Sequence, residues 1–180
     1  MRQVTAIIRR DHESIRLLLG IAEAFAEGLA RGEPVAIEHL REVNELLLTF
    51  VTRCHCAQEA EVLFPVLVDR GAWHRAALLA IMVEEHELGA DELDAMIAAL
   101  AKGDLLAWAA QARAYVELIL RHARIEDDLM LTAADRVLSP DEQLELAAAF
   151  ERLAEERLGA GGRDAVDRRI GALAAALKSG

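Results

Sequence analysis

The chain has 180 residues, 54 % of them hydrophobic, and a formal net charge of −11. This acidic balance argues against a nucleic-acid-binding protein, which needs a basic face for phosphate groups. No apolar run approaches the length that spans a membrane, and the early charges Arg9, Arg10 and Asp11 are not typical of a secretory signal.

Apolar residues, mostly alanine and leucine, recur with helical spacing along most of the chain. This pattern predicts an all-α fold with four long helices, at about residues 4–30, 35–69, 72–101 and 104–137. The connections between these helices are short, which favours an antiparallel, up-down-up-down four-helix bundle. Pro65 lies within the second helix, where the loss of a backbone hydrogen bond predicts a kink.

A fifth helix has a clear beginning after this bundle. Ser139 is a suitable N-cap, Pro140 suits the first helical position, and Glu142 would complete a capping box. We expect this helix to end near Gly159 and a last amphipathic helix to follow at about 164–177. The sequence therefore predicts a bundle over residues 1–138 and a helical extension of the same domain over 139–180. Apolar faces on the extension leave both a monomer and a homodimer open.

Four of the six histidines lie within apolar stripes, one in each of the four long helices. Two of them are followed four residues later by a glutamate, and residues at this spacing share a helical face. The six side chains are His12, His55, Glu59, His86, His122 and Glu126. Two buried carboxylates without partners would cost several kcal/mol each, so their convergence predicts a site for two metal ions.

We interpret the other histidines, the tyrosine and the two cysteines near these positions as structural or surface residues. Helical spacing turns His39 and His74 away from the predicted centre, so we interpret both as surface residues. Tyr115 lies on nearly the same face as the fourth-helix histidine and is interpreted as structural, with contact to the metal as the alternative. Cys54 and Cys56 stand two positions apart, which disfavours a disulfide between them. Their unpaired state predicts a reducing, cytoplasmic location, and we interpret both as packing residues, with a redox role for one as the alternative.

The motifs that contain the histidines resemble those of the hemerythrin-like family, also described as HHE cation-binding domains. The four similar segments are Asp11–Ile15, His55–Pro65, Glu85–Glu87 and His122–Met130. This resemblance implies a left-handed four-helix bundle with a non-haem di-iron centre. It implies that His12 and His55 hold one iron, that His86 and His122 hold the other, and that the two glutamates bridge the ions.

The resemblance implies two iron ions as the cofactor, in the Fe2+ or Fe3+ state, joined by carboxylates and an oxo or hydroxo group. Manganese or zinc remain alternatives for this mixed imidazole and carboxylate set. Oxygen-carrying members have a further histidine where this chain has Ala90, and they use an aspartate at the offset of Asp127. We therefore keep Asp127 as the alternative to Glu126 as a bridging residue.

The function implied by this resemblance is binding, sensing or reaction with O2, NO or peroxide, in iron homeostasis or in oxidative or nitrosative stress. Ala90 offers no metal ligand, which leaves more open coordination and favours reactivity or sensing over reversible O2 transport. A small di-iron oxidase or peroxidase is one alternative, and a helical interaction module with adventitious metal is another. No nucleic-acid or membrane partner is expected, and no catalytic residue is predicted.

Overall fold

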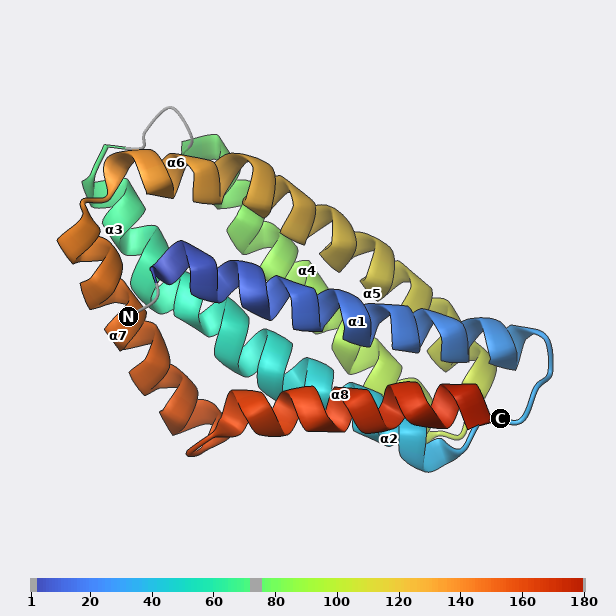
Figure 1. The fold of residues 1–180 in the computed structure, drawn as a ribbon. Coiled ribbons are helices and arrows are strands. Elements are labelled where there is room, and N and C mark those ends of the chain that lie inside the picture. Colours follow the sequence, from blue (N-terminus) through green and yellow to red (C-terminus); the bar gives the residue numbers. More distant parts are fainter. Residues whose placement is uncertain (1–2, 72–75, 180) are drawn as a thin grey trace.

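The computed structural model describes residues 3–71 and 76–179 (Figure 1). Within these ranges the chain is helical apart from short connections and contains no β-strand, which confirms the predicted all-α class. In the same ranges, no helix is both long enough and apolar enough to cross a membrane. His74, predicted to be a surface residue, lies outside the described residues.

Four long helical segments follow one another along the chain, close to the predicted bounds. They are α1 (Val4–Ala30); a second segment made of α2 (Ile37–Leu46), η1 (Leu47–Cys56), η2 (Glu59–Leu63) and α3 (Phe64–Asp69); α4 (Ala76–Ala101); and a fourth made of α5 (Leu105–Ile125), η4 (Glu126–Met130) and α6 (Leu131–Val137). Helix α5 packs against both α1 and α4, and α2 contacts the same two helices. The four segments therefore form a helical bundle around a common interior (Figure 1).

Parts of the second and fourth segments are π-helical, a feature that apolar periodicity does not predict. A π-helix pairs residue i with i+5, so each turn contains more residues than an α-helical turn. The π-helical stretches η2 and η4 begin at Glu59 and Glu126, and η1 ends just after His55. Such turns occur frequently at functional sites. Pro65 is the second residue of α3, directly after η2, and the kink expected there stays a prediction.

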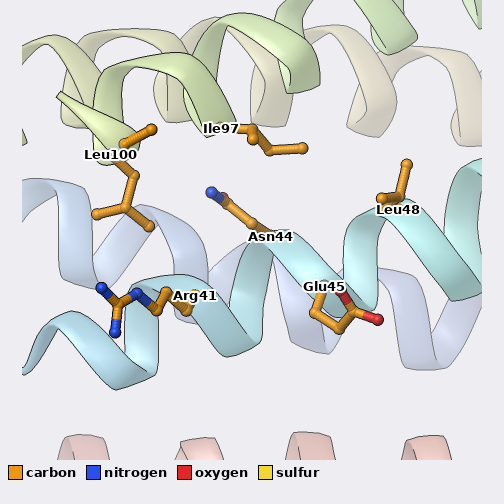
Figure 2. A pocket seen from close by; sticks show the side chains of 7 residues that line it. Arg41, Asn44, Glu45, Leu48, Ile97 and Leu100 are labelled. Atoms are coloured by element: carbon orange, nitrogen blue, oxygen red, sulfur yellow. The ribbon is translucent and has the colours of Figure 1, made fainter.

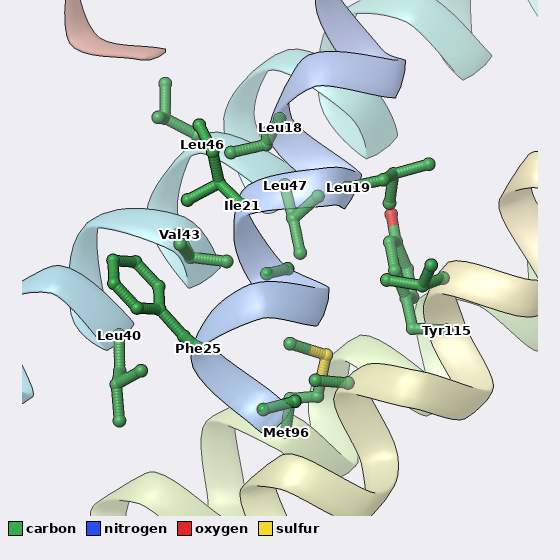
Figure 3. Packing of buried hydrophobic residues seen from close by; sticks show 14 of the residues in the cluster. Leu18, Leu19, Ile21, Phe25, Leu40, Val43, Leu46, Leu47, Met96 and Tyr115 are labelled. Carbon is green, nitrogen blue, oxygen red and sulfur yellow. The ribbon is translucent and has the colours of Figure 1, made fainter. Parts of the chain in front are cut away.

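The apolar interior consists of two clusters with a polar layer between them. One cluster, shown in part in Figure 3, includes Phe25 and Ile15, and the other includes Ile8 and Phe64. Along α1, His12 lies between Ile8 and Ile15, so it stands between the two clusters. The fold thus places this histidine in the middle of the bundle, with apolar side chains on either side of it along the helix.

The predicted C-terminal extension is formed by α7 (Pro140–Leu158) and α8 (Gly162–Ser179). The Ser139 hydroxyl accepts a hydrogen bond from the backbone of Glu142, and the Glu142 carboxylate accepts one from the backbone of Ser139, which confirms the capping box. Both helices pack on α1, and α7 also contacts η1 and η2 (Figure 1). The division into a bundle over 1–138 and an extension of the same domain stays a prediction.

Candidate metal centre

The structure brings the six predicted side chains together in the polar layer. His12, His55, Glu59 and Glu126 each present a nitrogen or oxygen, and these four atoms all lie within 4.8 Å of one another. His86 and His122 adjoin this group. The Nε2 atom of His86 lies 3.1 Å from Glu59 Oε2, and that of His122 lies 3.7 Å from Glu126 Oε2.

The spacing of these atoms fits donors arranged around a cation. The distance is 3.3 Å from His12 Nε2 to Glu126 Oε2 and 3.1 Å from His55 Nε2 to Glu59 Oε1. The two Nε2 atoms of His86 and His122 are also 3.1 Å apart. Two donors at right angles, each about 2.1 Å from one ion, lie about 3 Å from each other. The observed separations are thus close to those of neighbouring ligands on a shared ion.

The two carboxylates are the strongest sign that a cation belongs here. Glu59 and Glu126 are 0 % exposed, and none of their four oxygens has a hydrogen-bond partner. The nearby histidine nitrogens lie within ion-pair distance of them but not in hydrogen-bonding geometry. Burial raises the pKa of Glu59 well above its usual value, and the Glu126 carboxylate raises it further. A divalent cation would satisfy both carboxylates, so the residues present fit a metal.

A second layer of carboxylates stands behind three of the histidines. Asp127, the alternative bridging residue, contacts the outer nitrogen of His12, with 2.8 Å between Asp127 Oδ1 and His12 Nδ1. Glu85 Oε2 lies 3.0 Å from Nδ1 of His122. An ionised carboxylate only accepts hydrogen bonds, so each Nδ1 carries the proton. His122 thereby keeps Nε2 free to face the centre, and such outer partners orient metal-binding histidines.

The third outer carboxylate is Asp11, whose Oδ2 lies 3.9 Å from Nδ1 of His55. Asp11 is held by Arg163 from α8 through two hydrogen bonds of 2.9 and 3.0 Å. Burial alone would raise the pKa of Asp11, but His55 and Arg163 outweigh it and hold this pKa below its usual value.

Each of these three carboxylates is paired with an arginine, which was not predicted from the sequence. The partners are Arg16 for Asp127, Arg121 for Glu85 and Arg163 for Asp11. In each of the three pairs the arginine and the carboxylate lie at least 36 positions apart in the chain, so no local motif could reveal them.

The surroundings shift the pKa of the histidines in different directions. Burial alone would lower the pKa of His12, but Asp127 and Glu126 outweigh it and raise this pKa to about 10. Burial lowers the pKa of His86 and that of His122 below the usual value. A cation must therefore displace a proton from His12, whereas His86 and His122 favour the neutral form that binds metal.

The remaining candidate residues have the following positions. His39 is half-buried and stacks on Phe25, with 5.7 Å between the ring centres. Tyr115 is buried in the apolar cluster that Figure 3 shows in part. Cys54 and Cys56 are unpaired, as expected. Cys56 lies close to Glu59 and His86 of the candidate centre, a proximity that the sequence did not predict.

The sequence model of one protein family, the hemerythrin HHE cation binding domain, matches residues 3–134. The chain belongs to this family. No curated protein and no solved structure matches the chain. The matched range contains all four segments of the bundle up to α6 and all six predicted site residues. Membership in this cation-binding family and the buried histidines and glutamates agree that the site is suited to metal.

A separate pocket of this hemerythrin-family chain lies between α2 and α4 (Figure 2). It has a volume of about 380 Å³, and Asn44, Leu48, Ile97 and Leu100 are among its lining residues. The Asn44 carbonyl oxygen accepts a hydrogen bond of 3.0 Å from the Trp108 ring. None of the six site residues lines this pocket, so it is distinct from the candidate metal centre.

Proposed function

We propose that this chain is a di-iron protein that binds, senses or reacts with O2, NO or peroxide, in iron homeostasis or in oxidative or nitrosative stress. His12 and His55 would hold one ion, His86 and His122 the other, and Glu59 and Glu126 would bridge them. Iron bound in this way supplies open coordination positions and two accessible oxidation states for small ligands.

The observation that carries this proposal is the pair of fully buried carboxylates without hydrogen-bond partners, each with histidine nitrogens nearby. A buried carboxylate without a compensating charge costs several kcal/mol, and burial accordingly raises the pKa of Glu59 well above its usual value. Glu126 is compensated differently, since burial alone would raise its pKa but His12 and the other nearby histidines outweigh it and hold this pKa at about 2. Imidazole and carboxylate ligands suit iron, manganese and zinc. Of these ions, only iron and manganese are redox-active, and we propose iron because the resemblance of the motifs to hemerythrin-like proteins implies a di-iron centre.

The protein's own residues would prepare the site for small ligands. Glu85 and Asp127 fix two imidazole rings from behind, so these rings need no rearrangement when the site is filled. The apolar clusters on both sides of the polar layer limit the entry of water. A small uncharged molecule such as O2 or NO is less affected by this barrier than an ion.

We further propose the up-down-up-down topology, which the short connections between successive segments support. The two unpaired cysteines support a cytoplasmic location. Whether the protein acts as a monomer or a homodimer stays a prediction.

Iron quantitation combined with absorption spectra tests the proposal. Protein reconstituted anaerobically with Fe(II) should hold about two iron ions per chain, and O2 or NO should change its near-ultraviolet and visible spectrum. Less than about one ion per chain, with no spectral change, would contradict the proposal. Peroxide turnover by the loaded protein would indicate an enzyme, whereas stoichiometric binding without turnover would indicate a sensor or carrier.

Matched variants connect the iron to the named residues. His55→Ala and Glu126→Ala should each lower both the iron content and the melting temperature after reconstitution, because each removes a ligand. His39→Ala should leave both the iron content and the rise in melting temperature on adding iron unchanged, because His39 stacks on Phe25 and belongs to neither group of candidate ligands. Equal losses in all three variants would show that the ligands are assigned wrongly.

A further inference from the structure

Cys56 lies beside the proposed metal centre. Its sulfur, one carboxylate oxygen of Glu59 and one ring nitrogen of His86 all lie within 4.8 Å of one another. Glu59 also belongs to the group that contains His12 and His55. The two groups of donor atoms share the Glu59 carboxylate, so they form two neighbouring candidate sites. The sites differ because only one of them includes a sulfur atom.

A second, independent observation points to a ligand at this position. The Glu59 side chain is 0 % exposed, and both of its oxygens lack hydrogen-bond partners. Its Oε2 atom lies 3.1 Å from Nε2 of His86 without hydrogen-bonding geometry. Cys56 thus adjoins a buried acceptor that the protein itself leaves unsatisfied, as expected for a position that a cation occupies.

We propose that Cys56 is a ligand of the ion held by His86 and Glu59. The proposal rests on the proposed function, because it adds one donor to that centre. When the bond forms, the S–H bond breaks, the proton passes to the surrounding solvent, and a sulfur lone pair is donated to the ion. No electron is transferred and no further reactant is needed.

The consequence is a centre with two unequal sites. The site of His12 and His55 would have nitrogen and oxygen donors only, whereas the site of His86 would include a soft thiolate. Thiolate ligands favour zinc, copper(I) and iron over hard cations such as magnesium or manganese. The two positions should therefore differ in metal preference, and in an iron-loaded protein they should differ spectroscopically.

Cys54 provides a matched control two positions away in the same π-helical stretch. It is fully buried and belongs to neither donor group. Its charged neighbours are Arg163 and Asp11, on the side where α8 packs. The chain contains no other cysteine, so two single serine variants account for every thiol.

X-ray absorption of the zinc-loaded 180-residue chain tests the proposal, because a Zn–S bond of about 2.3 Å is resolved from Zn–N and Zn–O bonds of about 2.0–2.1 Å. We expect a sulfur shell in the wild type and in Cys54→Ser, and its loss in Cys56→Ser. Cobalt(II) gives a second readout, since a cobalt–thiolate charge-transfer band in the near ultraviolet should follow the same pattern. Zinc content and far-ultraviolet circular dichroism are measured on each sample.

The outcomes separate this proposal from the proposed function. Stoichiometric zinc with nitrogen and oxygen neighbours only would overturn the role of Cys56 and leave the metal centre standing. A sulfur shell that persists in Cys56→Ser and disappears in Cys54→Ser would also overturn it. Absence of bound zinc here and of bound iron after reconstitution with Fe(II) would overturn both. If Cys56→Ser does not fold, a sulfur shell retained in Cys54→Ser still assigns the bond, because Cys56 is then the only thiol.

Discussion

At the scale of single residues, Glu59 has opposite effects on stability in the metal-free and in the metal-loaded protein. Without a cation, Glu59 is a fully buried acid with no hydrogen-bond partner, and burial disfavours its charged form. With a cation, the same carboxylate becomes a ligand. Glu59 therefore lowers the stability of the metal-free protein but contributes to metal binding.

The substitution Glu59→Gln tests the effect on stability and the effect on metal binding separately. It keeps the size of the side chain but removes the buried acid, so the metal-free protein should become more stable by roughly 1–3 kcal/mol at neutral pH. The same variant should lose most of the stabilisation that wild type gains from metal. Thermal unfolding with and without Fe(II) measures both effects, and a Glu59→Gln variant stabilised by metal as much as wild type would contradict the role of Glu59.

The outer carboxylates allow a test of positioning without removal of a ligand. Glu85→Gln weakens the acceptor for Nδ1 of His122 and should lower metal affinity about 10–100-fold. The neighbouring substitution Glu84→Gln removes the same charge from an exposed position and should leave affinity nearly unchanged. Competition with a metal-binding dye gives both affinities, and equal losses in the two variants would indicate only a general effect of charge.

The raised pKa of His12 predicts how metal binding depends on pH. A cation binds the ring only after its proton has left, so affinity should rise about tenfold per pH unit from this residue alone as pH increases toward 10. In the metal-free protein, the His12 charge stabilises the fold below its unfolded pKa, and this contribution is lost as pH rises through about 10. Zinc titrations between about pH 6 and 8 measure the effect, and an affinity that is constant over this range would contradict it.

At the scale of helices, the sequence pattern predicted the α-helical segments of the structure but not its π-helical turns. Apolar spacing predicted the helices, and the capping box at Ser139 was readable because all its residues are local. A π-helical turn has no residue types that distinguish it from an α-helical turn. The spacing of 100° per residue assumes an α-helix, so it did not reveal the π-helical turns. This spacing still placed Glu59 correctly beside His55, because residues four apart remain neighbours on either kind of helix.

Helical periodicity and local motifs could not predict contacts between segments that are distant in the chain. Arg163 belongs to the C-terminal extension, yet it pairs with Asp11 of α1, which in turn faces His55. No motif connects residues this far apart in the chain. The proximity of Cys56 to His86 was not predicted for a related reason, since it depends on how two helices pack together.

The Arg163–Asp11 pair predicts that the extension stabilises the bundle. Both side chains are largely buried, so Arg163→Ala should cost about 3 kcal/mol by leaving the Asp11 carboxylate without its cation. The exposed Arg168→Ala is the control and should cost less than about 0.5 kcal/mol. Chemical denaturation of the metal-free proteins checks the difference. Adding Asp11→Asn to Arg163→Ala should recover part of the loss, and no recovery would mean that the pair is not the cause.

At the scale of the whole molecule, metal and fold should be thermodynamically coupled. The proposed ligands come from all four segments of the bundle, so a cation that binds them would stabilise only the folded chain. With free metal at about 100 times the dissociation constant, the gain is about 2.7 kcal/mol per site. For a protein of this length we expect a rise in melting temperature of about 5–10 °C per site. Calorimetry at several metal concentrations measures it, and a melting temperature independent of metal would contradict the coupling.

The most direct test of the central claim is anomalous X-ray diffraction from crystals of the iron-loaded protein, recorded at the iron absorption edge. The account predicts two neighbouring anomalous peaks inside the bundle, one next to His12 and His55 and the other next to His86 and His122, with Glu59 and Glu126 in contact with both. An interior without any anomalous peak in crystals that contain iron, or peaks only at the protein surface, would contradict it.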